Sequence, residues 1–390
     1  MTKSPPPLNP VFANRPVTIF AVMSALAQQH GAINLGQGFP DEDGPKGLLK
    51  LAADALVKGP NQYAPVPGMP ELRQAVARAN ARFYGLDYDW NDVVVVTAGA
   101  TEGLAAAFFA FLQPTDEAIV LAPTYDCYAP LIEAAGAVVK VVPLAPPRWR
   151  VDATSLAAAI TPKTRVIVVN TPHNPAARAY TREELQAIAD IAIANDLTVI
   201  CDEVYEHLVF DGAAHIPLAS LPGMAGRCVR IGSAGKTFSV TGWRIGYVSG
   251  PRHLIGVLTK AHSFIAYTCP SHLQRAVAAG LDFADEYYRD FLQEMQGKRD
   301  LIIDALATAG FDVLPCEATY FVNVDIRSVG ADDDDAFCRE ITEKAGVTAV
   351  PVSAFYPGND GPRHLARFCF CKRPEVLREA SARLKAYFHR

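Results

Sequence analysis

The chain has 390 residues, half of them hydrophobic and a fifth charged, and its formal net charge at pH 7 is −5. This length and composition allow a large buried core in about two domains. The sequence has no basic stripe for nucleic acid and no polybasic segment for a membrane surface, so we expect small-molecule partners and neither nucleic acid nor membrane.

The apolar segment over residues 17–27 has two interpretations. It has the length of the apolar part of a signal peptide, and it ends in small residues typical of a cleavage site. It also has the spacing of an amphipathic helix with Ile19, Met23 and Leu26 on one face. We favour the helix, because the eight scattered cysteines are typical of buried thiols in a reducing compartment, and we expect a cytoplasmic protein.

Residues 93–248 alternate short apolar strands with helical stretches, which is typical of a mostly parallel α/β sheet. In the helical stretch 181–195, Thr181 and Glu184 have the spacing of a capping box. The expected strands are 93–97, 118–121, 138–142, 166–170, 199–202, 228–232 and 245–249. We therefore expect an α/β fold whose large domain contains a mostly parallel, seven-stranded sheet.

Beyond residue 287 a long helix precedes short strands and helices, which is typical of a smaller α+β domain. The strands expected there are 311–314, 320–324, 347–352 and 367–370. The predicted domains are an N-terminal arm with part of the small domain over 1–47, the large domain over 48–286 and the C-terminal small domain over 287–390.

The acidic run 332–335 is either a cation site or a solvated helix start. We favour the helix start, because four adjacent side chains on a helix cannot converge on one ion, whereas negative charge complements the helix dipole. No cysteine or histidine spacing suggests zinc, so we expect no metal site.

Lys236 follows an apolar strand in Ser233-Ala234-Gly235-Lys236, where the small neighbours allow a ligand to approach the backbone. A lysine amine can form an imine with an aldehyde cofactor, exchange it for a substrate amine and then move the proton on the substrate Cα. Asp202 ends another strand, and its carboxylate can keep a pyridine nitrogen protonated. A strand-end aspartate is usually only a cap. Tyr205, three residues on, can reach the 3'-oxygen of the same ring and therefore favours the interpretation that Asp202 binds a ligand.

A phosphate site is predicted from three separate segments. Gly99, Ala100 and Thr101 lie between a strand and a helix, where backbone amides can bind an anion. Ser233 and Arg244 can complete this cup, since a guanidinium makes charge-assisted hydrogen bonds. With Lys236, Asp202 and Tyr205, these residues indicate binding of pyridoxal 5'-phosphate.

Two further residues have alternative interpretations. Tyr125 can stack on the cofactor ring or fill the core. Asn174 can hydrogen-bond the 3'-oxygen of the ring, or it belongs to a proline-flanked turn, in which asparagine is common. We interpret its neighbour His173 as structural, because Lys236 already accounts for proton transfer.

Together these motifs resemble the class I and II aminotransferases of fold type I along nearly the whole chain. A narrower set resembles the kynurenine aminotransferase/glutamine transaminase K group and its bacterial methionine aminotransferase relatives. The segments that carry this narrower resemblance are Asn34 to Asp41, Asn61 to Tyr63, Asn170 to Pro175, Asp202 to Glu206, Gly232 to Ser239, Thr241 to Arg244 and Arg367 to Phe370.

The resemblance implies a homodimer with active sites at the subunit interface, in which Tyr63 reaches the phosphate bound by the other subunit. It also implies that Arg367 binds the substrate carboxylate with help from Asn174 and the backbone of Gly38. The aromatic residues that it implies around the substrate side chain are Phe20, Tyr125 and, from the other subunit, Tyr267.

Two departures from the group argue against kynurenine as the main substrate. Much of the group has Asn-Pro-Thr-Gly where this chain has Asn-Pro-Ala-Ala at 174–177, and the kynurenine enzymes tend to have tryptophan where this chain has Phe20.

We therefore expect a pyridoxal-phosphate-dependent aminotransferase that moves an amino group from methionine, glutamine or an aromatic amino acid to a 2-oxo acid by a ping-pong mechanism. A β-lyase acting on cysteine conjugates uses the same residues and stays open as an alternative. A ligand-sensing domain of a transcription regulator is disfavoured, since it needs a basic DNA-binding module and only a short proline-rich arm precedes the domain.

Overall fold

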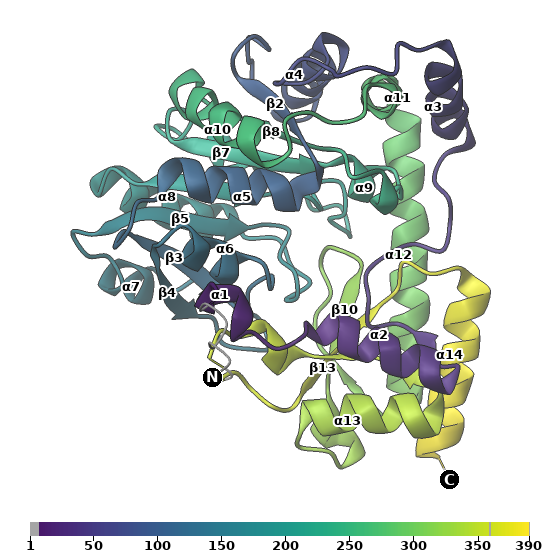
Figure 1. Cartoon of the computed structure of the whole chain (residues 1–390). Coiled ribbons are helices and arrows are strands. Elements are labelled where there is room, and N and C mark those ends of the chain that lie inside the picture. Colours follow the sequence, from purple (N-terminus) through teal and green to yellow (C-terminus); the bar gives the residue numbers. More distant parts are fainter. Residues whose placement is uncertain (1–7, 359, 390) are drawn as a thin grey trace, which may run out of the picture.

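The computed structural model describes residues 8–358 and 360–389. Its largest element is a seven-stranded sheet in the order β2-β8-β7-β6-β5-β3-β4 (Figure 1). The strands are β2 (Val94–Thr97), β3 (Glu117–Ala122), β4 (Val138–Pro143), β5 (Thr164–Asn170), β6 (Thr198–Asp202), β7 (Cys228–Ser233) and β8 (Gly246–Ser249). Strand β8 is antiparallel to both of its neighbours and the other pairs are parallel, so the predicted mostly parallel, seven-stranded sheet is confirmed.

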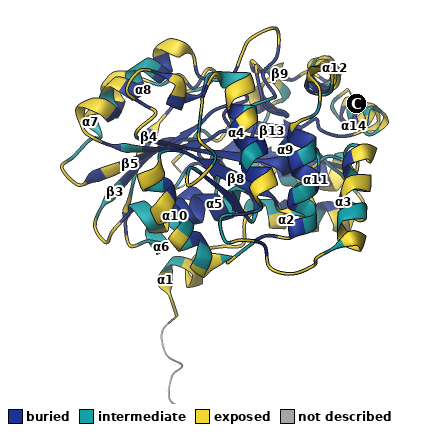
Figure 2. Cartoon of the chain, turned by 90° about the horizontal axis from the view of Figure 1, so that it is seen from above, coloured by how far each residue is buried: buried dark blue, intermediate teal, exposed yellow. Residues whose placement is uncertain are grey.

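Helices cover both faces of this sheet, which explains the nearly continuous apolar sequence of its inner strands. Every residue of β2, β7 and β8 is buried, and Figure 2 shows the strands as a buried layer with helices around it that are buried on one side and exposed on the other. The edge strand β4 leaves Val138 and Val141 partly exposed. The helices of this region are α3 (Lys46–Lys58), α4 (Pro70–Tyr84), α5 (Gly99–Phe111), α6 (Tyr128–Ala134), α7 (Ala153–Ala158), α8 (Arg182–Ala194), α9 (Ala234–Thr237), α10 (Arg252–Ile265) and α11 (Ser271–Leu281). The capping box predicted from Thr181 and Glu184 is present at the start of α8.

A second region contains a four-stranded antiparallel sheet in the order β12-β13-β10-β9, with β9 (Asp312–Val313), β10 (Phe321–Asp325), β12 (Val350–Pro351) and β13 (Leu365–Cys369). A separate parallel pair joins β1 (Ile33–Asn34) to β11 (Val347–Thr348). The segment 347–352, expected as one strand, is therefore divided between two sheets. The pairing of β1 with β11 places residues 33–34 against this second region.

The long helix α12 (Asp285–Thr308) runs from the large sheet to the second region, where it packs against α14 (Pro374–Phe388) (Figure 1). The predicted domain boundary after residue 286 falls in the first turn of α12. The division into three domain segments stays a prediction.

The segment 17–27 contributes to helix α2 (Ile19–His30), which begins after the N-cap Thr18 and follows the short helix α1 (Pro10–Ala13). Met23 is fully buried, and Ile19 and Leu26 pack against the core of the second region. The predicted amphipathic helix and its apolar face are confirmed. No helix in residues 8–358 and 360–389 is long and apolar enough to cross a membrane.

The acidic run 332–335 begins helix α13 (Asp334–Glu340), and the N-cap Asp333 accepts a hydrogen bond from the backbone of Ala336. The helix start is confirmed, but its description as solvated is wrong for Asp334. This carboxylate is fully buried and accepts hydrogen bonds from both the backbone N–H and the hydroxyl of Ser353 at 2.8 Å. Within the described part of the chain, no three His, Cys, Asp or Glu side chains are grouped so that they could hold a metal ion.

Candidate active site

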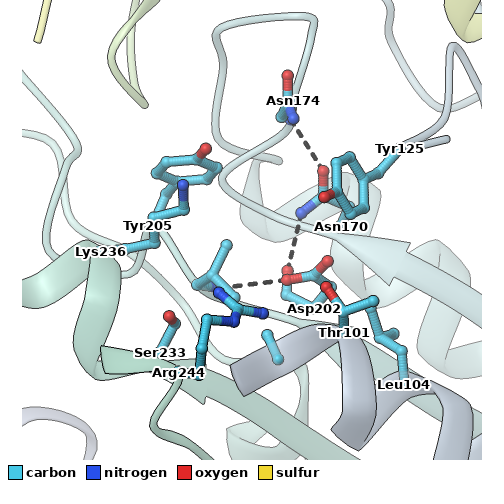
Figure 3. A pocket seen from close by; sticks show the side chains of 12 residues that line it. Thr101, Leu104, Tyr125, Asn170, Asn174, Asp202, Tyr205, Ser233, Lys236 and Arg244 are labelled. Carbon is cyan, nitrogen blue, oxygen red and sulfur yellow. Dashed lines mark hydrogen bonds between the residues drawn. The ribbon is translucent and has the colours of Figure 1, made fainter. Parts of the chain in front are cut away.

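A cavity lies at the carboxyl ends of β5, β6 and β7, where parallel α/β sheets bind ligands. Three of its residues are the last of their strands: Asn170, Asp202 and Ser233. Its empty volume is about 610 Å³ including the opening to solvent, which suits a small molecule. The cavity is lined by Ala100, Thr101, Leu104, Tyr125, Asn170, Asn174, Asp202, Val204, Tyr205, Ser233, Lys236 and Arg244 (Figure 3).

Lys236 lies in the short helix α9, which directly follows β7. Its amine Nζ donates a hydrogen bond to the hydroxyl of Tyr320 at 2.5 Å and lies 3.4 Å from the carbonyl oxygen of Gly38. Burial lowers the pKa of Lys236 to about 8. At neutral pH the Lys236 ammonium therefore releases its proton far more readily than the ammonium of an exposed lysine does.

Asp202 is buried at the end of β6. Its Oδ2 accepts a hydrogen bond from the hydroxyl of Tyr128 at 2.5 Å, and its Oδ1 accepts one from the backbone N–H of Val204 at 3.4 Å. Burial raises the pKa of Asp202 to about 6, and these hydrogen bonds oppose the rise. The carboxylate is thus ionised at pH 7 in a place where a cationic partner would stabilise it.

Tyr205 and Tyr320 flank the lysine on one side of the cavity. Their rings meet edge to face with centroids 5.0 Å apart, and Nζ of Lys236 lies 5.5 Å from the centroid of Tyr205. Burial raises the pKa of both phenols well above its ordinary value, so both hydroxyls stay protonated. Figure 3 shows Tyr205 beside Lys236, with Asp202 and Thr101 across the cavity.

Another part of the cavity has cationic and amide groups suited to an anion. Helix α5 begins at Gly99, which has a φ of 76°, and its first N–H groups have no partner within the helix. A Cβ at Gly99 would collide with the guanidinium of Arg244, so glycine is required for Arg244 to lie against this helix end. With the hydroxyl of Ser233 nearby, these groups can hold a phosphate.

Arg367 comes from β13 in the second region and is 1% exposed. Its guanidinium donates to Oδ1 of Asn174 at 2.5 Å and to the carbonyl oxygen of Gly36 at 2.9 Å. It also lies over the ring of Phe321, with Cζ 3.8 Å from the centroid. Burial lowers the pKa of Arg367 to about 10, which leaves the guanidinium charged at neutral pH. Arg367 itself does not line the cavity, but its partner Asn174 does, so the guanidinium adjoins the cavity through Asn174. A charged guanidinium in this position suits a carboxylate.

Phe20 of helix α2 borders Arg367. The guanidinium Cζ lies 5.4 Å from the centroid of the Phe20 ring, which meets the ring of Phe355 edge to face at 5.7 Å. The carbonyl oxygen of Gly38 accepts a hydrogen bond from the hydroxyl of Tyr320. The predicted contact between the Gly38 backbone and a substrate carboxylate stays a prediction.

Tyr63 and Tyr267 do not line the cavity of their own chain. Their rings meet edge to face at 5.2 Å on the surface, where Tyr63 is 81% and Tyr267 is 49% exposed. Their expected roles in the site of the other subunit stay predictions.

Tyr128 and Tyr320, which were not predicted as site residues, contact Asp202 and Lys236. Both have the sequence context of core aromatics, so no local signal distinguishes them. Asn170 is different, because it ends its strand as Asp202 ends the next, and its amide Nδ2 donates to the Asp202 carbonyl oxygen at 3.0 Å. The strand-end rule that predicted Asp202 would also have found Asn170. His173 is buried, its pKa is lowered by burial to about 3, and its Nδ1 accepts from the backbone of Ala176, which fits the structural role expected for it.

Comparison with known proteins now identifies the class. The family model for aminotransferase class I and II matches residues 30–384, and the chain belongs to this family. The resemblance predicted from the motifs is confirmed, and the protein is an aminotransferase with amino acid and 2-oxo acid substrates.

Three relatives show where in the family the chain lies. It is 45% identical to the probable N-succinyldiaminopimelate aminotransferase of Mycobacterium tuberculosis, over 96% of both chains. It is 40% identical to the methionine aminotransferase of Escherichia coli, covering 94% of this chain and 95% of that one. It is 36% identical to kynurenine–oxoglutarate transaminase 3 of Mus musculus, covering 95% of this chain and 88% of that one. The last two groups were expected from the motifs, whereas the first was not.

Solved structures agree with these similarities. The structure of N-succinyldiaminopimelate aminotransferase from Mycobacterium tuberculosis has a TM-score of 0.95 at 45% identity, covering 97% of this chain and all of that chain. The Escherichia coli structure described as having a methionine aminotransferase function has a TM-score of 0.94 at 39% identity, covering 98% and 100%. The expected aminotransferase fold, with a large sheet and a smaller one, is confirmed.

Proposed function

We propose that this aminotransferase binds pyridoxal 5'-phosphate and moves the amino group of methionine, glutamine or an aromatic amino acid to a 2-oxo acid by a ping-pong mechanism. The observation that carries the proposal is one cavity that holds the Lys236 amine, the Asp202 carboxylate and the Arg244 guanidinium.

The residues present fit this cofactor in charge and in chemistry. Arg244 and the start of α5 offer a cationic end for the phosphate, and Gly99 leaves the room that Arg244 needs. Asp202 offers a buried anion for the pyridine N–H, and Lys236 offers the amine. When bound, pyridoxal 5'-phosphate supplies an aldehyde carbon for amine exchange and a ring that withdraws electrons from the substrate Cα.

Asp202 provides a buried negative charge at the end of β6. Its pKa of about 6 leaves it ionised at neutral pH, and a protonated ring nitrogen would satisfy the buried charge. Tyr128 donates to Oδ2 and the Val204 backbone donates to Oδ1, so both carboxylate oxygens have a donor that restrains their orientation. With pyridoxal 5'-phosphate bound, Asp202 would pair with the ring nitrogen and keep it protonated.

Lys236 moves the proton at the substrate Cα. Since burial lowers its pKa to about 8, the amine can both take up and release a proton near neutral pH, as a general acid–base catalyst requires. Arg367 holds the substrate carboxylate with Asn174, which fixes the Cα relative to the lysine. The buried rings of Tyr205 and Tyr320 keep water from this side of the amine.

The choice of donor is inferred from the surroundings of Arg367. The contacts of its guanidinium include the rings of Phe20, Phe321 and Phe355, which suit an apolar or aromatic side chain. The 40% identity to a methionine aminotransferase supports the same choice. A second candidate is transfer to or from an N-succinyl-diaminopimelate-type substrate, which the 45% identity to a probable N-succinyldiaminopimelate aminotransferase favours.

A panel of donors and acceptors separates these candidates. The absorbance change of the bound cofactor in single half-reactions should be fastest with methionine, glutamine, phenylalanine or tyrosine as donor. A half-reaction that is at least about tenfold faster with N-succinyl-diaminopimelate would replace the first candidate by the second, since tenfold corresponds to 1.36 kcal/mol in the barrier. Formation of pyruvate and ammonia from a cysteine conjugate, in place of an oxo acid, would favour the β-lyase alternative.

We also propose a homodimer in which each subunit completes the site of the other. The aromatic pair of Tyr63 and Tyr267 is exposed, as is Phe264 at 92%, and exposed aromatic side chains support this proposal. Tyr63→Ala and Lys236→Ala homodimers should each be nearly inactive, and subunit exchange between them should restore activity, because one mixed site then has both residues. Verified mixed dimers without activity would place Tyr63 outside the other subunit's site.

A further inference from the structure

The hydroxyl of Tyr320 lies between two groups that come from distant parts of the chain. It donates its proton to the carbonyl oxygen of Gly38 at 2.7 Å, and it accepts a hydrogen bond from Nζ of Lys236 at 2.5 Å. Tyr320 is 1% exposed, and its ring packs edge to face on Tyr205. With its ring packed and its hydrogen directed to Gly38, the Tyr320 oxygen presents a lone pair to the lysine amine. The hydroxyl of Tyr205 is a further hydrogen-bonding neighbour of this oxygen.

We propose that Tyr320 is a positioning residue, which holds the amine of Lys236 in one place whenever that amine is free of cofactor and substrate. The inference rests on the role of Lys236 in the proposed function. Amine exchange frees the lysine in each half-reaction, and its long side chain has several rotamers to lose before it can act. The hydroxyl of Tyr320 and the carbonyl of Gly38, 3.4 Å from Nζ, define a single resting position for it.

The direction of the hydrogen bond also determines whether it raises or lowers the pKa of Lys236. Since the only proton of the hydroxyl is engaged by Gly38, Tyr320 can only accept from Lys236. An acceptor stabilises the ammonium more than the neutral amine, because the charged group is the stronger donor. Burial, with the charges of Arg244 and Arg367, lowers the pKa of Lys236 to about 8, and the thiols of Cys371 and Cys369 oppose this fall. The hydrogen bond that Tyr320 accepts from Nζ opposes it as well.

The same contacts connect the lysine to the carboxylate-binding arginine. The carbonyl of Gly36 accepts from the guanidinium of Arg367, and two residues later the carbonyl of Gly38 accepts from Tyr320. The segment 36–38 thus contacts two of the three cationic groups of the site, Arg367 through Gly36 and Lys236 through Gly38. Tyr320 joins Lys236 to this segment, so the resting position of the amine and the position of Arg367 share one support.

The test measures Lys236 directly, in protein freed of cofactor. Competitive acetylation with acetic anhydride over a range of pH, followed by mass spectrometry of the Lys236 peptide, gives the pH at which the amine becomes reactive. In the parent this midpoint should lie near 8. In Tyr320→Phe it should fall by about one pH unit, as expected for loss of one hydrogen bond to a charged group.

Tyr288→Phe is the matched control, because Tyr288 is also buried and its hydroxyl donates to the carbonyl of Leu281 at 3.1 Å, in helix α11. This variant loses an equivalent hydrogen bond and should keep the parent midpoint. A midpoint in Tyr320→Phe that is unchanged or raised overturns the proposal.

Two further measurements separate the role of Tyr320 from folding and from amino transfer. If Tyr320→Phe does not fold, 3-fluorotyrosine can replace Tyr320, because it keeps the ring and the hydroxyl but weakens the oxygen as an acceptor. The acetylation midpoint of Lys236 should then fall by less than one pH unit. A midpoint equal to that of the parent overturns the proposal. Acetylation does not depend on amino transfer. If the parent has the expected Lys236 midpoint but transfers no amino group, the proposed function is wrong and the role of Tyr320 is not. If the parent is active but neither Tyr320→Phe nor 3-fluorotyrosine at position 320 changes the midpoint, the role of Tyr320 is wrong and the proposed function is not.

Discussion

The two halves of the candidate site are built in different ways. The half proposed for the cofactor uses residues at the ends of neighbouring parallel strands, Asn170, Asp202 and Ser233. The half around Arg367 joins segments as far apart as 331 residues, through the hydrogen bond from Arg367 to Gly36. The first half follows from a rule of sheet topology, whereas the second depends on how the N-terminal segment packs on the smaller sheet.

The two halves also treat their buried charges differently. Burial raises the pKa of Asp202 to about 6, and hydroxyl and backbone donors hold the carboxylate. Burial lowers the pKa of Arg367 to about 10, and an amide, a carbonyl and aromatic rings hold the guanidinium. Changes in the first half should therefore affect the chemistry with every substrate, whereas changes in the second half should separate carboxylate binding from side-chain recognition.

The largest effect is expected from Lys236→Ala. Without the amine, the half-reaction should slow by more than about 10⁴-fold, because the variant lacks both the nucleophile and the general base. The variant should still bind the cofactor without a covalent link, through Asp202 and the phosphate site. Borohydride reduction of the parent followed by peptide mapping should find the cofactor on Lys236, and labelling of a different lysine would contradict the assignment. Lys58→Ala, at an exposed position in α3, is the control and should behave as the parent.

Asp202→Asn should have the next largest effect. Loss of the charge at the ring nitrogen should slow proton abstraction by at least about 3 kcal/mol in the barrier, at 1.36 kcal/mol for each tenfold change, with the fold retained. A half-reaction rate close to that of the parent would show that the carboxylate has a different role.

The same variant tests whether Asp202 causes the pH dependence of cofactor binding. Since the pKa of Asp202 is raised to about 6, protonation removes its negative charge as the pH falls through that value. The affinity of the parent for the cofactor, measured by fluorescence titration, should accordingly fall below about pH 6, while Asp202→Asn should lack this step.

Arg367→Ala should lower kcat/KM for every amino donor by a similar factor. The lost contact is to the carboxylate that all donors share, and loss of one partner of a buried charge pair costs about 2–4 kcal/mol. Steady-state rates with methionine, phenylalanine, glutamine, kynurenine, aspartate and alanine test this uniformity. Arg363→Ala, four residues earlier and half exposed, should leave all six rates unchanged.

The smallest and most selective effect is expected from Phe20→Ala. Its ring borders Arg367 but offers only apolar contact, so methionine and phenylalanine should lose about 1–3 kcal/mol in kcat/KM while alanine loses little. Phe12→Ala removes an exposed ring near the N-terminus and should change no rate. Aspartate as the best donor of the parent, or an equal loss for all six donors in Phe20→Ala, would refute the apolar-pocket interpretation.

The sequence by itself determined the architecture and the cofactor half of the site to a large extent. Apolar runs followed by polar residues located β5, β6 and β7 and the ends at which Asp202 and Ser233 lie, because in a parallel sheet strand direction determines which edge a residue reaches. Helix α2 and the capping box of α8 were also predictable, since apolar periodicity and end-capping residues are local features.

Only the tertiary structure decided which buried polar groups meet. Tyr128 and Tyr320 have the sequence signature of core aromatics, yet their hydroxyls contact Asp202 and Lys236. Asp334, in an acidic run typical of a surface, is buried because Ser353 hydrogen-bonds it across a distance of 19 residues. The segment 347–352 is divided between two sheets for a related reason, since each part pairs with a strand from a different part of the chain. Local sequence encodes periodicity and end groups, whereas these contacts depend on non-local packing, which fixes distances between segments that no local pattern specifies.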